Sequence, residues 1–525
     1  MLDLKKCLCV LQKNSYFSSQ AKENDSTKIM EKNQKMGRRD KKGGAALKSM
    51  LLTLVQVVTT VLGIIVTKLL SVHFSLEDYG TYSQALLITS TVTSISILGL
   101  TNATNYYYNR TEDTIYRKKY ISTIFSIQYL VGVISAIFLI VFRSAIAEAF
   151  GNGRLENVIL VVAFTPLLTN LIAMYQNLFV SIGEAKKIAA RNFIVSVVKL
   201  LAVIMACFVI KNIVTVLVVI LITDVFQVLY FAVMFSKDQW PIRLQNSEKD
   251  LVIEILKFSI PMAVYVMTNS LSRDIDKYVI SAFSDTATLA IYSNAAKVLP
   301  FDLLTASLIT VLVPIITRQI NQGQKHEAQK LFKLYLRIGY ILTCTFVGGA
   351  IAVARYLMLF LYDEKYMAGY PIFVIYLFAD MIRFANVTTI LSGSGKTKTL
   401  MTISVVTLAL NAVCNVVAFF LFGMIGPAIT TLVLTFLMNL LLLHFGAKEI
   451  ETSVLHLFDI KEMSIIGIQI IIFGTLAHIL SNRLSDIGLS SFFILAISFG
   501  FYVIVMFLLN AKRIISCLKS LNQYK

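Results

Sequence analysis

Apolar runs of about 20 residues alternate with short polar connections along most of this chain, and a helix needs a run of that length to cross a bilayer. The pattern predicts fourteen transmembrane helices and an all-α integral membrane fold. The expected spans are 49–72, 83–105, 120–142, 156–180, 190–210, 213–235, 256–282, 296–317, 336–361, 369–392, 400–422, 427–446, 463–481 and 489–510.

Composition supports a membrane protein and argues against a soluble enzyme. Hydrophobic residues make up 57% of the chain, charged residues only 15%, and the mean hydropathy is +0.73. A soluble domain carries about 25% charged residues. The connections are short and leave no room for a soluble catalytic domain, so we expect a transporter. The polar, basic residues 1–46 predict a disordered cytoplasmic tail.

Lysine and arginine predict the orientation, because cytoplasmic loops are enriched in both. With a cytoplasmic N-terminus, 36 of the 48 Lys and Arg residues fall on the cytoplasmic side. Six fall in outer loops, and six lie within spans. We therefore expect a plasma membrane protein with both termini in the cytoplasm. The net charge of +18 reflects this topology, and no basic patch with interleaved aromatics points to nucleic acid.

An internal repeat divides the spans into two halves. Phe74-Ser75 matches Phe283-Ser284, and Tyr82-Ser83-x-Ala85 matches Tyr292-Ser293-x-Ala295, at offsets of 209 and 210. The matched segments lie six spans apart, and an even number of crossings preserves their orientation in the membrane. Two six-helix lobes should therefore be related by a pseudo-two-fold axis along the membrane normal. The predicted division is a tail at 1–46, an N-lobe at 47–245, a C-lobe at 246–446, and two further helices with a cytoplasmic C-terminus at 447–525.

Ionisable side chains within the predicted spans are the candidate functional residues, because such a group is costly at mid-bilayer unless it faces a cavity or a partner. The seventh span is the densest. Its Asn269, Arg273 and Lys277 recur every four residues and share one helical face. This face predicts one wall of a cavity between the lobes. The other candidates are Lys68 and Lys297 for substrate binding, and Asp276, Asp224, Asp380 and Arg383 for coupling or charge pairing.

A purely structural role for these charges stays open at this point. Arg273 could pair with Asp276 or with Asp274, and Lys277 could extend its head toward the interface. Asp380 and Arg383, three residues apart, suit an internal ion pair as well as a site. The cysteines and histidines show no metal-ligand spacing, and we expect no bound cofactor.

Several segments resemble the Wzx-type polysaccharide-transport family of lipid-linked oligosaccharide flippases, within the superfamily that also holds MATE exporters and MurJ. They are LLSVHFSLEDYGTYS (69–83), LGLTNATNYYYNR (98–110), FSIPMAVYVMTNSLSRDIDKYVI (258–280), YSNAAKV (292–298) and NAVCNVVAFFLFGMIGPAITT (411–431). The resemblance covers about residues 47–450, and the long basic tail departs from it.

The resemblance implies that the protein moves an undecaprenyl-diphosphate-linked oligosaccharide from the cytoplasmic to the outer leaflet by alternating access. Arg273 and Lys277 would then meet the diphosphate, and Asp276 would orient them or couple a proton or sodium gradient. Partners would be membrane lipid, a glycan polymerase and assembly proteins, with the flippase itself a monomer. A MurJ-like lipid II flippase and a MATE-type drug exporter are the alternatives, and the short outer loops argue against a membrane enzyme.

Overall fold

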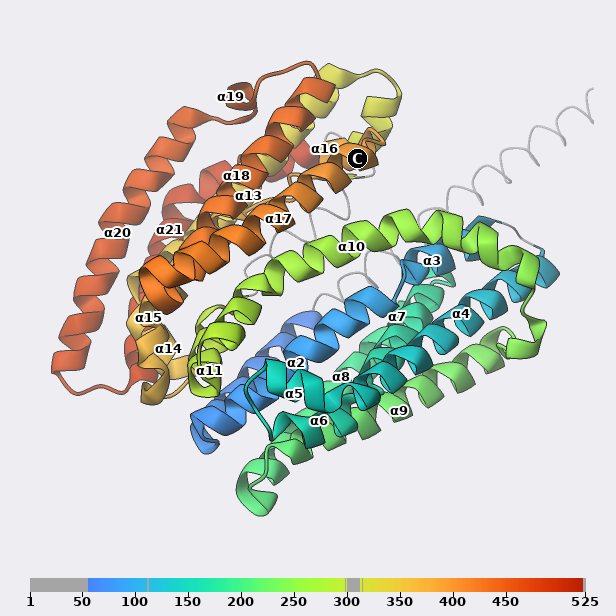
Figure 1. Cartoon of the computed structure of the whole chain (residues 1–525). Coiled ribbons are helices and arrows are strands. Elements are labelled where there is room, and N and C mark those ends of the chain that lie inside the picture. The colour runs from blue at the N-terminus through green and yellow to red at the C-terminus, as the bar shows by residue number, and fades with distance from the viewer. Residues whose placement is uncertain (1–54, 111–112, 298, 300–311, 314, 523–525) are drawn as a thin grey trace, which may run out of the picture.

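The computed structural model of this chain describes residues 55–110, 113–297, 299, 312–313 and 315–522 (Figure 1). The predicted tail at 1–46 lies outside these residues. Within them every regular element is helical, as the hydropathy pattern predicts. Eleven helical segments are long and apolar enough to cross a membrane. The protein is therefore an all-α, multi-pass membrane protein.

The first half of the chain forms one helical bundle. Its elements are a helix at Val55–His73, α2 (Leu76–Ser96), α3 (Leu100–Arg110), α4 (Thr114–Val141), α5 (Arg143–Ala149), α6 (Leu155–Val162), α7 (Thr165–Ser181), α8 (Ala185–Met205) and α9 (Val214–Asp238).

The second half forms another bundle. Its elements are α10 (Lys249–Phe283), α11 (Thr286–Ala295), α13 (Lys325–Ala352), α14 (Ala354–Leu361), a 3-10 turn at Glu364–Gly369, α15 (Tyr370–Ile382), α16 (Thr389–Gly393), α17 (Thr397–Phe422), α18 (Gly426–Glu449) and α19 (Val454–Leu457). The last two long helices, α20 (Ile460–Asp486) and α21 (Ser491–Asn522), pack on α13.

The count of fourteen spans stays a prediction. One of the eleven segments, Thr397–Glu449, contains both α17 and α18. The predicted eighth span at 296–317 falls mostly outside the described residues. The tenth, at 369–392, is broken into α15 and α16, and neither piece is long enough to cross alone. The ninth, at 336–361, is displaced, because α13 ends at Ala352 and α14 starts a new helix at Ala354.

The repeat predicted from the sequence appears as two equivalent helix starts. Ser75 caps α2 by accepting from the backbone N–H of Asp78, and Asp285, 210 residues later, caps α11 by accepting from that of Thr288. The hydrogen bonds from Thr288 hold the pKa of Asp285 below its ordinary value. The helices α2 and α11 then pack against each other across the two lobes.

The lobes meet at one end and diverge toward the other (Figure 1). At the end where α2 and α11 begin, here termed the closed end, one hydrophobic cluster joins Leu70, Phe74 and Tyr79 of the N-lobe to Leu289 and Tyr362 of the C-lobe. Burial of these side chains favours close contact of the lobes there.

Helix α10 contacts both lobes. Near its start, Glu254 forms an ion pair with Arg110 of α3 at 2.6 Å. Nearer its end, the carbonyl of Ser272 accepts from the side-chain amide of Asn411 on α17 at 2.9 Å. The residues between these anchors therefore run along the space between the two lobes.

Candidate functional site

A cavity of about 470 Å³ lies between α2 of the N-lobe and α10, α11, α15 and α18 of the C-lobe. From α2 it is lined by Ser83, Leu87 and Ser90, which follow the four- and three-residue spacing of one helical face. From α10 it is lined by Ser270, Arg273, Asp274 and Lys277. The remaining lining residues, of which the first three are also on α2, are Tyr79, Tyr82, Leu86, Ser293, Asn294, Ala296, Lys297, Tyr376, Arg383 and Thr431.

The repeat contributes to both walls of this cavity. Ser83 and Ser293, matched in the sequence at an offset of 210, both line it. Tyr79, one turn before Ser83, donates its hydroxyl to the side-chain oxygen of Asn294 at 2.7 Å. The two equivalent helix starts thus bound one end of the space between the lobes.

Cations predominate in the lining. Among the residues that the structure describes, the lining contains the cations Arg273, Lys277, Lys297 and Arg383 and one carboxylate, that of Asp274. Four positive charges against one in a space inside the membrane fit an anionic ligand, because uncompensated charge is costly there.

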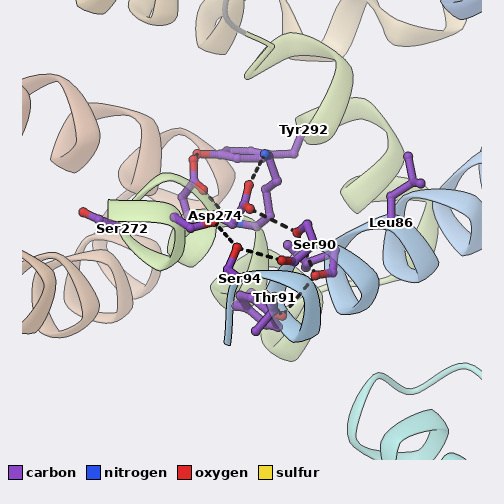
Figure 2. Close-up of polar contacts among 12 residues, drawn as sticks. Leu86, Ser90, Thr91, Ser94, Ser272, Asp274 and Tyr292 are labelled. Atoms are coloured by element: carbon purple, nitrogen blue, oxygen red, sulfur yellow. Dashed lines mark hydrogen bonds and ion pairs between the residues drawn. The ribbon is translucent and has the colours of Figure 1, made fainter. Parts of the chain in front are cut away.

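One of the four cations is neutralised on its own helix. The Lys277 ammonium lies 2.6 Å from the Asp274 carboxylate, and both side chains are largely buried. The hydroxyl of Ser90 on α2 donates to the same carboxylate at 3.3 Å, as Figure 2 shows. Next to it, the hydroxyls of Ser94 and Ser270 lie 2.7 Å apart. These contacts form a polar seam that joins α2 to α10.

Two other cations have no carboxylate partner among the residues that the structure describes. Lys297 donates to the hydroxyl of Thr67 at 2.7 Å and forms no ion pair there. The Arg273 side chain forms neither a hydrogen bond nor an ion pair with any described residue, and it is exposed to the cavity. The guanidinium of Arg273 offers five N–H donors in a planar fork, which suits a phosphate.

Asp276 occupies a different environment from Arg273. It is only 1% exposed, and its carboxylate accepts from the hydroxyls of Tyr292, at 2.9 Å, and Tyr376. Its other oxygen accepts from the backbone N–H of Lys277 at 2.8 Å. The sequence offered Asp276 as a possible ion-pair partner of Arg273. In the structure its carboxylate instead lies among helices of the C-lobe.

Asp380 and Arg383 form the ion pair that their spacing allowed, with 3.5 Å between Asp380 Oδ1 and Arg383 Nη1. Asp380 is buried, and its second oxygen accepts from the backbone N–H of Leu299 at 3.1 Å. Arg383 therefore reaches the cavity as a partly neutralised cation.

Five of the predicted site residues are not among those that line this cavity: Asp276 and Asp380, described above, and Asn269, Lys68 and Asp224. Asn269 donates to the carbonyl of Tyr265 one turn earlier on α10. Lys68 reaches across the closed end to carbonyls of α14. Asp224 lies inside the N-lobe, where it accepts from Gln227 in a separate pocket that also contains Arg191 and Lys199.

Ser90 and Tyr376 are cavity residues that the sequence does not single out, and Asp274 enters the sequence analysis only as a possible partner of Arg273. Asp274 carries a signal, because it lies three residues before Lys277 in an apolar span, a spacing that allows an ion pair. Ser90 and Tyr376 carry none, since single hydroxyls are common in apolar helices. Among the described residues no group of three or more His, Cys, Asp or Glu could hold a metal ion.

The fold is that of known membrane transporters. Lipid II flippase MurJ in an inward closed conformation superposes with a TM-score of 0.69 at 15% identity, covering 89% of this chain and 100% of the MurJ chain. An inward-facing multidrug resistance MATE family transporter of the MOP superfamily gives 0.62 at 10% identity, covering 75% of this chain and 94% of that chain. An outward-facing structure of such a transporter gives 0.53 at 11% identity, covering 78% and 95%.

These matches and the interlobe cavity define a multi-pass membrane protein with the fold of MOP superfamily transporters. Residues 65–371 match the family described as polysaccharide biosynthesis protein, and the chain belongs to this family. The family resemblance seen in the sequence is thereby confirmed. A search of curated proteins finds no match.

Proposed function

We propose that this protein moves a polyprenyl-diphosphate-linked oligosaccharide across the plasma membrane, from the cytoplasmic to the outer leaflet, by alternating access. The observation that carries the proposal is the pair of cavity cations, Arg273 and Lys297, for which the described part of the chain holds no carboxylate partner. A diphosphate diester carries two negative charges, which matches the two uncompensated positive charges. Arg273 would hold it through bidentate hydrogen bonds, and Lys297 as a point charge.

Other features support the same ligand. Hydroxyls of Ser83, Ser90 and Ser293 line the cavity and can exchange hydrogen bonds with sugar hydroxyls. Tyr82 adds an aromatic surface for a sugar ring. The asymmetry of lysine and arginine in the sequence orients both termini toward the cytoplasm, so the closed end faces outward. The Asp276 carboxylate is the group that we assign to coupling with a proton or sodium gradient.

A lipid II-type substrate is a second candidate. The MurJ chain, which is covered completely by this one, is a lipid II flippase by name. The two candidates share the diphosphate and differ in the glycan, so the same cations serve both. A drug exporter fits less well, because a cationic cavity repels cationic drugs.

The cellular test is export of surface polysaccharide in the host strain with its own copy of the gene deleted. Arg273→Ala should abolish export, and Arg273→Lys should restore only part of it, because the bidentate contact is lost. Arg483→Ala, which removes an exposed arginine outside the cavity, is the matched control. Normal export by Arg273→Ala at parental protein abundance would overturn the proposal. Normal polysaccharide with loss of lipid II turnover would favour the second candidate.

A further inference from the structure

Two lysines at the closed end make mirrored contacts between the lobes. Lys68, on the helix 55–73 of the N-lobe, donates to the carbonyl of Leu359 at 3.0 Å and to that of Tyr362, at the end of α14 in the C-lobe. Lys365, in the turn after α14, donates to the carbonyl of Phe74 at 2.7 Å and to that of Val72 at 3.3 Å. Each lysine therefore binds backbone oxygens at the end of a helix in the opposite lobe.

These carbonyls are suited to a cation. The last four C=O groups of a helix have no partner within that helix and carry the negative end of its dipole. A lysine placed there caps the helix and makes charge-assisted hydrogen bonds. Both lysines are partly buried, so the contacts are less screened than those of a surface pair.

We propose that Lys68 and Lys365 form a reciprocal latch that holds the lobes together at the closed end and opens when the cavity opens there. The inference rests on the proposed function insofar as it takes this end to open during transport. Separation of α2 from α11 would carry each lysine away from its carbonyls and into the outer aqueous phase. Water can then solvate both the ammonium and the freed carbonyls, so the latch is breakable in a way that a buried ion pair is not.

The latch also explains why Lys68 is absent from the cavity wall. Its ammonium is committed to the far lobe, whereas Lys297 reaches Thr67, the residue beside Lys68, from inside the cavity. The two lysines therefore occupy different places: Lys68 lies at the closed end, and Lys297 lines the cavity.

The latch can be tested on the purified full-length protein by measuring the distance between spin labels on the two lobes. Labels at Gly153→Cys and Ser485→Cys, in a background whose six native cysteines are replaced, report on the closed end. Both positions are exposed, and a Cβ at Gly153 would meet no heavy atom within 4 Å.

The parent should show the short distance of the closed state. Lys68→Met and Lys365→Met should each raise the ratio of separated to closed protein by about tenfold, and together by more, because hydrogen bonds to a charged group are lost. Lys68→Arg and Lys365→Arg should keep the parental distance. Arg355→Met is the matched control, since Arg355 is exposed on α14 and makes no hydrogen bond or ion pair among the described residues.

A parental distance distribution in the double methionine variant would overturn the latch. If a methionine variant does not fold, Lys68→Gln and Lys365→Gln carry the same test with a milder change. The measurement needs no substrate, so it is separable from the proposed function. If the methionine variants shift the distance between the labels but the parent protein exports no glycan, the latch stands and only the transport proposal is overturned.

Discussion

Arg273 and Asp276 are three residues apart on α10, yet their side chains lie in opposite environments. Arg273 is exposed to the cavity, and Asp276 is 1% exposed among C-lobe helices. A buried carboxylate is tolerated only when its lost hydration is replaced by hydrogen bonds. Tyr292 and Tyr376 provide that replacement. One helix therefore places a cation in the cavity and an enclosed acid in the C-lobe.

Removal of one tyrosine hydroxyl should destabilise the protein. Tyr292→Phe deletes a donor to the Asp276 carboxylate and should cost about 1.5–3 kcal/mol, because the acceptor is charged and buried. The measurement is the thermal unfolding midpoint of the purified protein in detergent. Tyr502→Phe is the control, since its buried hydroxyl has no hydrogen-bond partner in the part of the chain that the structure describes. Equal midpoints for the two variants would show that the Tyr292 hydrogen bond contributes nothing.

The sequence predicts the cavity-facing cations better than it predicts the fate of the acids. The spacing of Arg273 and Lys277 places both on one helical face, and both line the cavity. The partners of Asp276 come from α11 and α15, and Tyr376 lies 100 residues away. No local pattern encodes such a contact, because it depends on how α10, α11 and α15 pack together.

The helices α2 and α11 approach unusually closely at the closed end. A Cβ added at Gly80 would overlap the backbone carbonyl of Thr286, the first residue of α11. Backbone cannot move aside as a flexible side chain can. The glycine thus permits the contact that closes the space between the lobes.

Gly80→Ala should therefore weaken packing at the closed end by about 1–3 kcal/mol, the usual cost of an extra carbon in a well-packed site. The measurement is again the thermal unfolding midpoint in detergent. Gly63→Ala provides the matched control, because Gly63 is also within a helix and an added Cβ would meet nothing within 4 Å. An unchanged midpoint in Gly80→Ala would mean that α2 and α11 can separate without loss of stability.

The observed bounds of a helix match those predicted from hydropathy where the span is uniformly apolar, and they depart from the prediction where it is not. The helix α13 begins at Lys325, eleven residues before the predicted span at 336. Its first turns carry several charges, which lower the hydropathy. However, Ala328, Leu331 and Tyr335 recur at helical spacing and are buried. The predicted tenth span also runs across the break between α15 and α16, where Arg383, Asn386 and Thr388 interrupt the apolar run.

At the scale of the whole molecule, the two lobes enclose a cationic cavity that is bounded at one end by packed side chains and the two interlobe lysine contacts. The inward-facing MATE family structure gives a TM-score of 0.62 and the outward-facing one 0.53, which agrees with this arrangement. The repeat in the sequence predicts the two lobes, but the length of α10 and its contacts with both of them emerge only from the fold. Transport by alternating access would require the lobes to separate at the closed end and to meet at the opposite end.

The central claim is that Arg273 and Lys297, cavity cations with no carboxylate partner among the described residues, carry a diphosphate across the membrane. Its most direct test is translocation in proteoliposomes of a fluorescent polyprenyl-diphosphate-linked disaccharide, beside an otherwise identical polyprenyl glycoside without phosphate. The parent should move the diphosphate and not the neutral lipid. Arg273→Ala combined with Lys297→Ala should slow the diphosphate at least about a hundredfold, because two charged contacts are lost. Parental rates in that double variant, or equal transport of the neutral lipid, would contradict the account.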